Sequence, residues 1–366
     1  MTVSDLHYLT LALVPGIGSA RLDVLLATFH DAAAVLAAPT AALREVPGIS
    51  RAAATAISRA DTERAAALVV RTHEQGGHVL LPSDSRFPAA LRDISEPPTL
   101  LFAAGKLEYL NRPAVTIVGS RGHSRYGAEA CRHFAAGTAR AGLVVVSGMA
   151  RGIDALAHSA ALDAGGGTVG VLGNGLGVVY PSANRALYER VGTHGCLVTE
   201  FPPGERPHAG SFPRRNRLLS GLSRVTLVVE AREKSGALIT VDCALNQGRD
   251  VLAVPGPITS PVSLGCNRLI QLGAKPALGL RDVLEEYGIK ATSAPAAALP
   301  TDLTESERRA LRAFDGGERH VDELVTALDC GPAEALAVLT SLEIRGLVVQ
   351  EPGKRFRPAH PHSARL

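Results

Sequence analysis

The sequence predicts an α/β protein: a Rossmann-like, doubly wound sheet flanked by an N-terminal helical domain of the helix-hairpin-helix or SAM-like type and by a C-terminal winged helix. Three observations predict this fold class. Apolar runs alternate with helical stretches in the middle of the chain, which is typical of parallel strands joined by crossover helices. Two proline–glycine turns recur near the N-terminus. Three short helical segments and a hairpin pattern lie near the C-terminus.

Length and composition bound the class of protein. The chain has 366 residues, enough for two or three domains, and 46% of them are hydrophobic. Its formal net charge is +3, with 33 arginines among 38 basic residues, so bulk charge alone predicts no nucleic acid. No apolar stretch is long enough for a membrane span, and the N-terminus lacks a secretory signal pattern. We therefore expect a cytoplasmic protein.

Residues 1–75 are predicted to form the helical domain. The segments Val14–Gly18 and Val46–Ser50 lie 32 residues apart and share the letters V-P-G-I. A tight glycine turn before a helix can offer backbone amides to a phosphate. The same turns also suit a small helical bundle without a ligand, and the second copy lacks the final glycine. Both interpretations stay open.

Residues 76–288 are predicted to form the Rossmann-like domain. Their apolar runs are continuous, as expected for strands buried on both faces, and the stretches between them fit crossover helices. Residues 78–110 are expected to add one or two strands. The predicted core strands are Ala114–Val118, Leu143–Val146, Thr168–Leu172, Cys196–Thr199, Val225–Val229 and Val251–Val254.

Residues 289–303 are predicted to be an alanine–proline linker and residues 304–366 a winged helix. Thr304 and Glu307 have capping-box spacing at the start of the first helix. The next two helices are mostly acidic, which disfavours insertion into a DNA groove. We expect any DNA contact of this domain at the wing and tail, which carry Lys354, Arg355, Arg357 and Arg365. A role in protein contacts or in stabilising a dimer is equally compatible.

Five scattered cysteines form no C-x-x-C pair, although disulfide frameworks and zinc knuckles need closely spaced cysteines. Zinc-protease, P-loop and nucleophile-elbow motifs do not occur in the sequence. We therefore predict no disulfide, no metal and no cofactor.

Ligands of open α/β sheets bind beyond the carboxyl ends of the strands, so the loops there are candidate sites. The first loop, Gly119–Gly122, contains Ser120 and Arg121, and Ser124 precedes the next helix. Glycines let a phosphate approach the backbone, and a helix N-terminus favours an anion. Because an arginine stands where a dinucleotide fingerprint needs glycine, NAD is not predicted.

The second loop, Ser147–Asp154, offers small residues and Arg151. Asp154 and His158 lie one helical turn apart, which suits the acid/base pair of a hydrolase. We favour a capping aspartate and a hydrogen-bonded histidine, because no nucleophile with a partner base lies beside them. In the third loop, Asn184 is predicted to cap the next helix.

A basic segment is the strongest candidate for a ligand site. Phe212 lies in a polar, glycine-flanked stretch directly before Arg214, Arg215, Asn216 and Arg217. An exposed aromatic ring can stack on any base, and arginines neutralise phosphates. In the alternative interpretation, Phe212 turns into the core and leaves a solvated basic face.

The fifth loop places Lys234, Ser235 and Gly236 at the start of a helix and predicts a small anion site. Its residue order does not match a P-loop, so ATP is not predicted. Together the loops supply amides, arginines and one aromatic ring. This set of groups is suited to binding phosphates and not to catalysing bond cleavage.

These segments together resemble the DprA/Smf family, in the family's order and over about residues 78–280. The resembling stretches are V-G-S-R (Val118–Arg121), S-G-M-A-R-G-I-D-A-L-A-H (Ser147–His158), Y-P-x-x-N (Tyr180–Asn184), S-F-P-R-R-N-R (Ser211–Arg217), K-S-G-A-L-I-T (Lys234–Thr240), G-R-D-V-L-A-V-P-G (Gly248–Gly256) and G-C-N-R-L-I-Q-L-G-A (Gly265–Ala274).

The resemblance implies a non-enzymatic homodimer that binds and protects single-stranded DNA and loads the RecA recombinase during natural transformation. It implies that Arg121 contacts phosphate and that Phe212 stacks on a base. By the same resemblance, the pocket is lined or supported by Arg214, Asn216, Arg217, Lys234, Ser235 and Gly236. Relatives often carry a lysine shortly before the phenylalanine. This chain has Ala209 and Gly210 there, so that charge is either missing or replaced by Arg206 or His208.

The segment around Leu264, Leu269 and Ile270 resembles the family's dimer and RecA-facing region, although these side chains suit an ordinary core equally well. Two other functions compete with DNA binding. One is a nucleotide-processing enzyme of the phosphoribohydrolase-like class, whose glutamate-bearing glycine loop is missing from this sequence. The other is a scaffold whose terminal domains recruit proteins.

Overall fold

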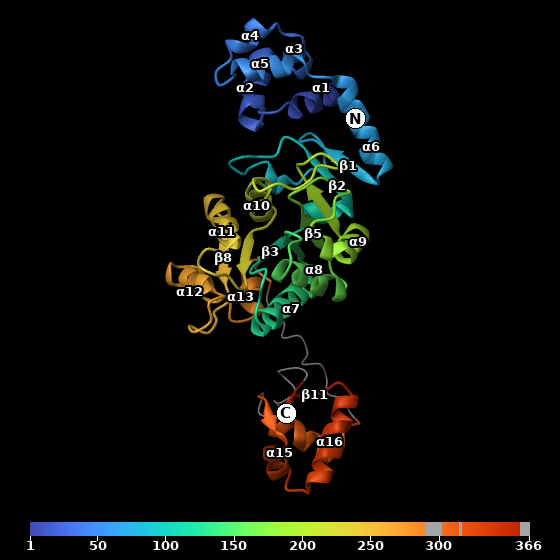
Figure 1. The fold of residues 1–366 in the computed structure, drawn as a ribbon, viewed down its shortest axis with the longest axis vertical. Helices are drawn as coiled ribbons and strands as arrows, with labels where there is room; N and C mark the ends of the chain where they lie inside the picture. The colour runs from blue at the N-terminus through green and yellow to red at the C-terminus, as the bar shows by residue number, and fades with distance from the viewer. Residues whose placement is uncertain (290–301, 315–316, 359–366) are drawn as a thin grey trace. The chain divides into compact units, whose positions relative to one another are not determined.

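The computed structural model describes residues 1–289, 302–314 and 317–358 (Figure 1). The chain forms two compact units, Met1–Ile289 and Lys290–Leu366, which are described separately. Most of the predicted linker, residues 290–301, and Arg365 of the predicted tail lie outside the described residues.

The first unit is built around a nine-stranded sheet with the order β1-β2-β6-β5-β4-β3-β7-β8-β9. From β6 to β9 the strands are parallel, and β1 and β2 add an antiparallel edge beside β6. This is the predicted doubly wound fold class. The strands are β1 (Gly77–Leu80), β2 (Leu101–Gly105), β3 (Ala114–Val118), β4 (Val144–Ser147), β5 (Thr168–Val171), β6 (Cys196–Thr199), β7 (Val225–Val228), β8 (Asp250–Ala253) and β9 (Lys275–Pro276).

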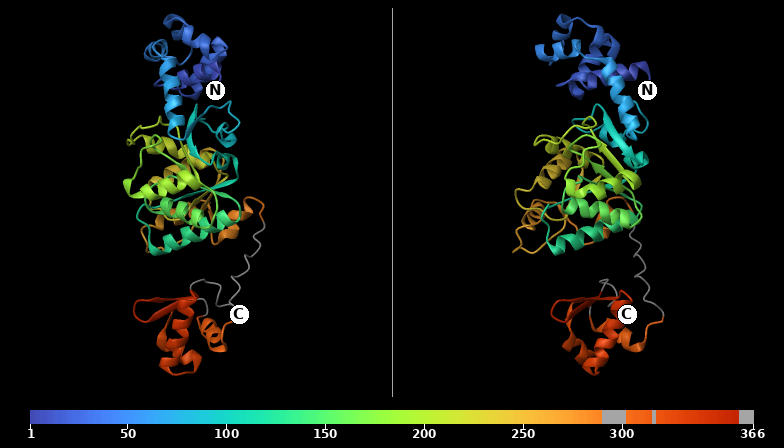
Figure 2. Two further views of the ribbon diagram at one scale, coloured as in Figure 1. Left: turned by 90° about the vertical axis from the view of Figure 1, so that its right-hand side faces the viewer. Right: turned by 45° about the vertical axis from the view of Figure 1, so that its right-hand side comes forward.

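Helices cover both faces of this sheet (Figure 2). Successive strand side chains point to opposite faces, so Val115 packs with α7 and α8 while Val118 packs with α10 and α11. The buried polar Thr116 is satisfied because its hydroxyl donates to the carbonyl of Leu219 at 2.6 Å. The helices are α7 (Arg125–Arg140), α8 (Ile153–Asp163), α9 (Arg185–His194), α10 (Ser211–Gly221), α11 (Gly236–Asn246), α12 (Leu264–Gln271) and α13 (Leu280–Glu285).

The N-terminal helices contain two copies of one hairpin. Gly16 and Gly48 adopt φ values of 81° and 82°, which only glycine adopts without strain, and equivalent apolar residues fill the domain core. Figure 2 shows α6 running from these helices to the β1 edge of the sheet, where Leu68 packs against Val79 and Leu81. The helices are α1 (Val3–Ala12), α2 (Ser19–Phe29), α3 (Ala32–Ala37), α4 (Thr40–Arg44), α5 (Arg51–Ser58) and α6 (Thr62–Glu74).

The second unit is the predicted winged helix. Thr304 and Glu307 form the expected capping box, and α14 (Glu305–Ala313), α15 (Val321–Leu328) and α16 (Pro332–Ile344) pack over one core. The wing is formed by β11 (Val348–Glu351) and β12 (Arg355–Pro358), with β10 (Arg319–His320) completing the sheet. Within the described residues, two of the basic wing side chains have acidic partners: Arg355 pairs with Glu318 and Arg357 with Glu351.

Among the described residues, no single helix has the length and apolar character to span a membrane. Only α15 and α16 taken together, with a bend of 105° between them, reach that length and composition.

Candidate functional site

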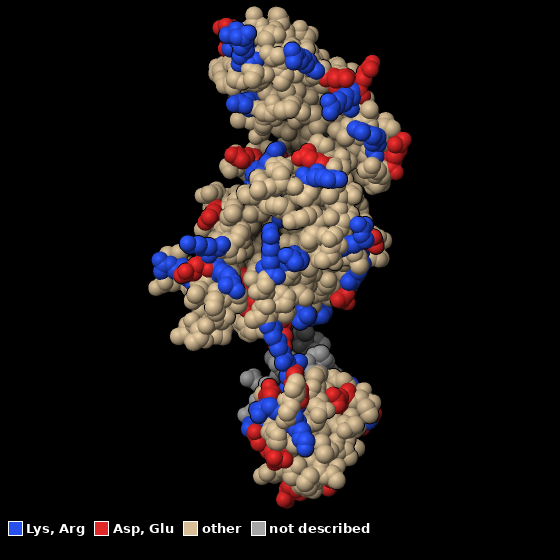
Figure 3. Space-filling view, in the orientation of Figure 1, with Lys and Arg blue, Asp and Glu red and all other residues tan. Residues whose placement is uncertain are grey.

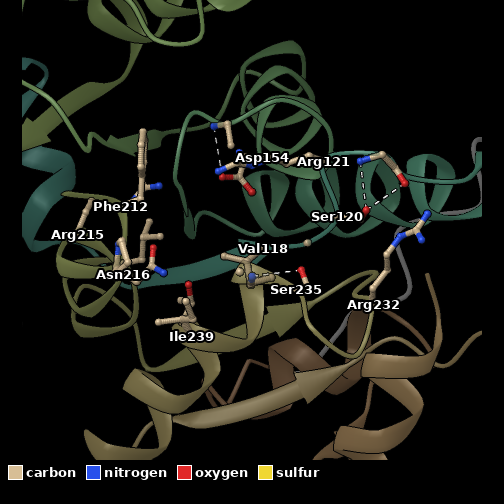
Figure 4. A pocket seen from close by; sticks show the side chains of 18 residues that line it. Val118, Ser120, Arg121, Asp154, Phe212, Arg215, Asn216, Arg232, Ser235 and Ile239 are labelled. Atoms are coloured by element: carbon tan, nitrogen blue, oxygen red, sulfur yellow. Dashed lines mark hydrogen bonds between the residues drawn. The ribbon is translucent and has the colours of Figure 1, made fainter. Parts of the chain in front are cut away.

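A pocket lies beyond the carboxyl ends of β3 and β7, where the chain order of the sheet reverses. It has a volume of about 580 Å³ and brings together seven of the predicted site residues: Ser120, Arg121, Phe212, Arg215, Asn216, Ser235 and Gly236. Figure 4 shows the α10 side chains at one end and Ser120 and Arg232 at the other. Figure 3 shows lysine and arginine side chains around a depression on this face. We refer to this site as the rim pocket.

The loop between β3 and α7 is held by Glu230, a residue that the sequence analysis did not select. The Ser120 amide donates to the Glu230 carbonyl at 2.7 Å, and the Ser124 amide and hydroxyl donate to its carboxylate at 2.9 and 2.5 Å. A larger residue does not fit at position 127, because the Cβ of any residue other than glycine would overlap the carboxylate of Glu230. The loop that carries Arg121 is therefore fixed at both ends.

This arrangement changes the expected role of the α7 N-terminus. We expected these amides to favour a ligand phosphate, but the anion beside them is the buried carboxylate of Glu230. Ser124 faces that carboxylate and does not line the rim pocket. Glu230 could have been selected from the sequence, because it lies at the end of an apolar strand.

The loop between β4 and α8 is shaped by two side chains. Asp154 accepts hydrogen bonds from the amides of Gly148 and Ala150 at 3.2 and 3.4 Å. Asn184 donates to the carbonyls of Met149 and Ala150 and makes no capping bond, so its predicted capping role is wrong. Its amide instead braces the loop that carries Arg151.

Arg151 lines a small cavity that adjoins the rim pocket. This cavity also contains Arg121, Phe212 and Tyr180, and the rings of Tyr180 and Phe212 lie 5.4 Å apart. Tyr180 was not selected from the sequence, although its Y-P-x-x-N segment was noted. Four arginines (Arg121, Arg151, Arg215 and Arg232) and two aromatic rings thus border the two adjoining cavities.

His158 does not form an acid/base pair. It is fully buried, its Nδ1 lies 2.6 Å from the Thr168 hydroxyl, and burial lowers its pKa to about 3. A neutral, enclosed imidazole cannot exchange protons with a substrate at neutral pH. Burial raises the pKa of Asp154 in spite of the opposing charge of Arg215.

The basic segment forms the first two turns of α10, and the helix divides it into two faces. Phe212, Arg215 and Asn216 point to the rim pocket, as their spacing of three and four residues dictates. Arg214 and Arg217 line a different groove. Phe212 is half-buried rather than enclosed, so its ring borders the hollow.

Arg215 is a buried side chain with hydrogen bonds to the main chain. Its guanidinium donates to the carbonyl of Gly148 at 2.7 Å and to that of Val171, where β4 and β5 end. Burial lowers its pKa to about 10, so it remains charged at neutral pH. Arg215 therefore holds two strand ends together at the floor of the hollow.

Arg217 is paired with a carboxylate. Its Nη2 donates to Glu200 at 2.7 Å, and the two side chains are only 13% and 5% exposed. Arg214 lies 3.6 Å from the same carboxylate but is mostly exposed. Glu200 directly follows strand β6, a position that could have been selected from the sequence.

The loop after β7 contributes Ser235 and Gly236. Ser235 accepts a hydrogen bond from the Ala237 amide and so begins α11, while Arg232, Ile239 and Thr240 complete the lining of the rim pocket. Lys234 is not among the residues that line it. Arg232 also lines it and was not among the residues predicted for the site.

The predicted interface residues have different environments. Leu264 is partly exposed, whereas Leu269 and Ile270 pack against the main core. Two leucines that the sequence analysis did not select are more exposed: Leu272 at 68% and Leu278 at 77%. Clustered His, Cys, Asp or Glu side chains that could hold a metal do not occur in the described part of the chain.

The fold and this hollow define an α/β protein with a cationic, aromatic site at the carboxyl ends of a parallel sheet. Comparisons with known proteins give the family. The family model "DNA recombination-mediator protein A" matches residues 78–288, and the model "DprA winged helix domain" matches residues 294–354. The chain therefore belongs to the DprA/Smf family of DNA-processing proteins.

Individual relatives agree with this assignment. DNA processing protein DprA of Streptococcus pneumoniae is 45% identical over 204 residues, covering 56% of this chain and 72% of that protein. Protein Smf of Escherichia coli is 38% identical, covering 78% of each. The X-ray structure of the S. pneumoniae protein gives a TM-score of 0.68 at 34% identity and covers 78% of this chain and 98% of that chain.

A second solved structure concerns the unique single-stranded DNA binding mode of DNA processing protein A from Helicobacter pylori. It gives a TM-score of 0.52 at 27% identity and covers 58% of this chain and 95% of that chain.

Proposed function

We propose that the rim pocket binds single-stranded DNA without cleaving it. The observation that carries this proposal is that Arg121 and Phe212, which lie 91 positions apart in the sequence, line the same hollow. A cation beside an accessible aromatic face can bind a phosphate and its base together and tolerates any base. The H. pylori relative named above supports the choice of a single strand.

The described residues suit binding rather than catalysis. Arg121, Arg151 and Arg232 provide positive charge, and the Phe212 and Tyr180 rings provide apolar faces. The histidine that a hydrolase interpretation needs is buried and neutral. Protection of the strand follows because bound phosphates and bases are shielded from attack.

Two variants test this site. Phe212→Ala should weaken binding to oligo-dT by about 1–3 kcal/mol through lost stacking, and adding Arg121→Ala should reduce both affinity and its salt dependence further. Fluorescence anisotropy at fixed salt measures both effects. Arg132→Ala, an exposed arginine outside these pockets, is the matched control. Unchanged binding by the double variant would refute the site.

We further propose that the protein acts as a homodimer that delivers the strand to RecA. The exposed leucines around α12, Leu264, Leu272 and Leu278, support an apolar contact there. Leu272→Arg combined with Leu278→Arg should yield a folded monomer in light scattering and reduce RecA filament formation on DNA. A dimer of unchanged affinity would contradict this second proposal.

A further inference from the structure

A second groove lies on the opposite side of α10 from the rim pocket. It consists of two adjoining cavities of about 630 and 510 Å³ between the N-terminal helices and the loop that follows β6. The two cavities share Leu13, Val14 and Pro15 of the first hairpin and Pro202 and Glu205 of the loop. We refer to them together as the hairpin groove.

The groove carries cations without partners. Arg59, Arg64 and Arg71 line it from α6 and the end of α5, and across the described residues their guanidinium groups form no hydrogen bond or ion pair. Asp61 also lines it, but its carboxylate accepts the first amides of α6. Unpaired arginines in a groove attract a polyanion, since folding gives them no internal carboxylate.

Acidic side chains in the groove are few and partly neutralised. Glu200 is bonded to Arg217 and lies close to Arg214, and Glu96 lies 3.8 Å from Arg217. Glu205 remains at the junction of the two cavities. The end of the groove that is lined by Arg59, Arg64 and Arg71 is therefore its most cationic part.

The two hairpins differ where the groove touches them. In the second hairpin, the Ser50 hydroxyl accepts the Ala53 amide, so the start of α5 is capped internally. In the first hairpin, the matching residue is Gly18, and the start of α2 has no side-chain cap. Of the two hairpin turns, that of the first lines the groove, whereas the second hairpin reaches it with the end of α5. The uncapped amides of α2 and the unpaired arginines thus occur on the same surface.

We propose that the single strand continues from the rim pocket across α10 into the hairpin groove, which binds its phosphates. This inference rests on the proposed function of the rim pocket. Arg214 provides the connection, because it is mostly exposed, lines the groove, and lies two residues from Phe212 in α10. The N-terminal domain then adds length and salt-dependent affinity to the binding site.

The first test uses oligo-dT of about 4 to about 24 nucleotides, a range set by typical single-strand site sizes. Arg59→Gln, Arg64→Gln and Arg71→Gln are combined in the full-length protein. Short oligonucleotides should bind as before, whereas long ones should lose affinity. For long oligonucleotides, the slope of log affinity against log salt should fall by about 2, since each phosphate contact contributes about 0.7.

The matched control combines Arg132→Gln, Arg140→Gln and Arg281→Gln, which remove the same charge from α7 and α13. It should bind both lengths like the wild type. Equal behaviour of the two triple variants would overturn the inference, as would a groove variant that lost only duplex affinity. If the wild type failed to bind short oligonucleotides, the proposed function of the rim pocket would fail instead.

A second variant separates DNA binding from folding. Gly18→Ser copies the cap of the second hairpin, and no atom beyond its chain neighbours lies within 4 Å of the position that its Cβ would take. It should weaken long-oligonucleotide binding by about fivefold, the worth of one cap of about 1 kcal/mol, without lowering the melting temperature. Ser50→Gly should leave DNA affinity unchanged. Tighter or unchanged binding by Gly18→Ser would contradict the role of these amides.

Discussion

The two faces of α10 are made from one run of residues and are stabilised differently. On the face toward the rim pocket, Arg215 is buried and bonded to main-chain carbonyls near Asp154. On the other face, Arg217 is paired with Glu200, and Arg214 is largely exposed. Three arginines within four positions therefore have three different environments.

This difference shows that local charge density is a weak guide to ligand contact. Arg215 contributes to the hollow mainly by joining the ends of β4 and β5. Phe212 and Arg121 lie above that floor and can reach a ligand. The buried Arg215 should control stability and pH dependence, and the exposed Arg214 should affect neither strongly.

The largest expected effect comes from Arg215→Ala. It removes the hydrogen bonds to Gly148 and Val171 and leaves the Asp154 carboxylate without its closest buried counter-charge, which should cost about 3–5 kcal/mol of unfolding free energy. Urea unfolding followed by far-ultraviolet circular dichroism measures this loss. A loss below about 1 kcal/mol would contradict the structural role, since that is the size of an ordinary substitution.

The buried side should also be sensitive to acid. His158 has a folded-state pKa of about 3 against 6.5 in the unfolded chain, so between these values only the unfolded chain binds the proton. The unfolding free energy should therefore fall by about 1.4 kcal/mol for each pH unit below about 6.5. His158→Gln should reduce that slope in urea titrations from pH 6.5 to 5. Identical slopes would show that His158 does not contribute.

The smallest expected effect is that of Arg214→Ala. The side chain is 59% exposed and its contact with Glu200 is 3.6 Å, so removing it should change the unfolding free energy by no more than about 0.5 kcal/mol. The same urea assay serves as the measurement. A loss approaching that of Arg215→Ala would erase the distinction between the two faces.

Most of the fold was predictable because it depends on patterns that the chain displays locally. Continuous valine-rich runs predicted the core strands, and Cys196–Thr199 agrees residue for residue with β6. The fold class is confirmed. The partners of individual side chains were not predictable from local patterns. Asn184 was assigned a cap by its position before a helix, but its amide bonds the loop of a neighbouring strand 34 to 35 positions away.

The candidate site, like the fold, was predictable only in part. Loop positions at strand ends predicted where Ser120, Arg121 and Ser235 would meet, because parallel strands end at one edge of a sheet. The direction of each α10 side chain depends on the helical register, which the sequence analysis did not apply to that segment. The roles of Glu200 and Glu230 depend on pairings over long sequence separations, such as the 106 positions between Ser124 and Glu230.

The carboxylate of Glu230 at the start of α7 also has a consequence for competing metabolites. Related folds leave the first helix of the sheet open for the pyrophosphate of a dinucleotide. In this protein that place already holds the carboxylate of Glu230, which accepts hydrogen bonds from the Ser124 amide and hydroxyl. A pyrophosphate placed at this helix start would meet that carboxylate in place of free amides.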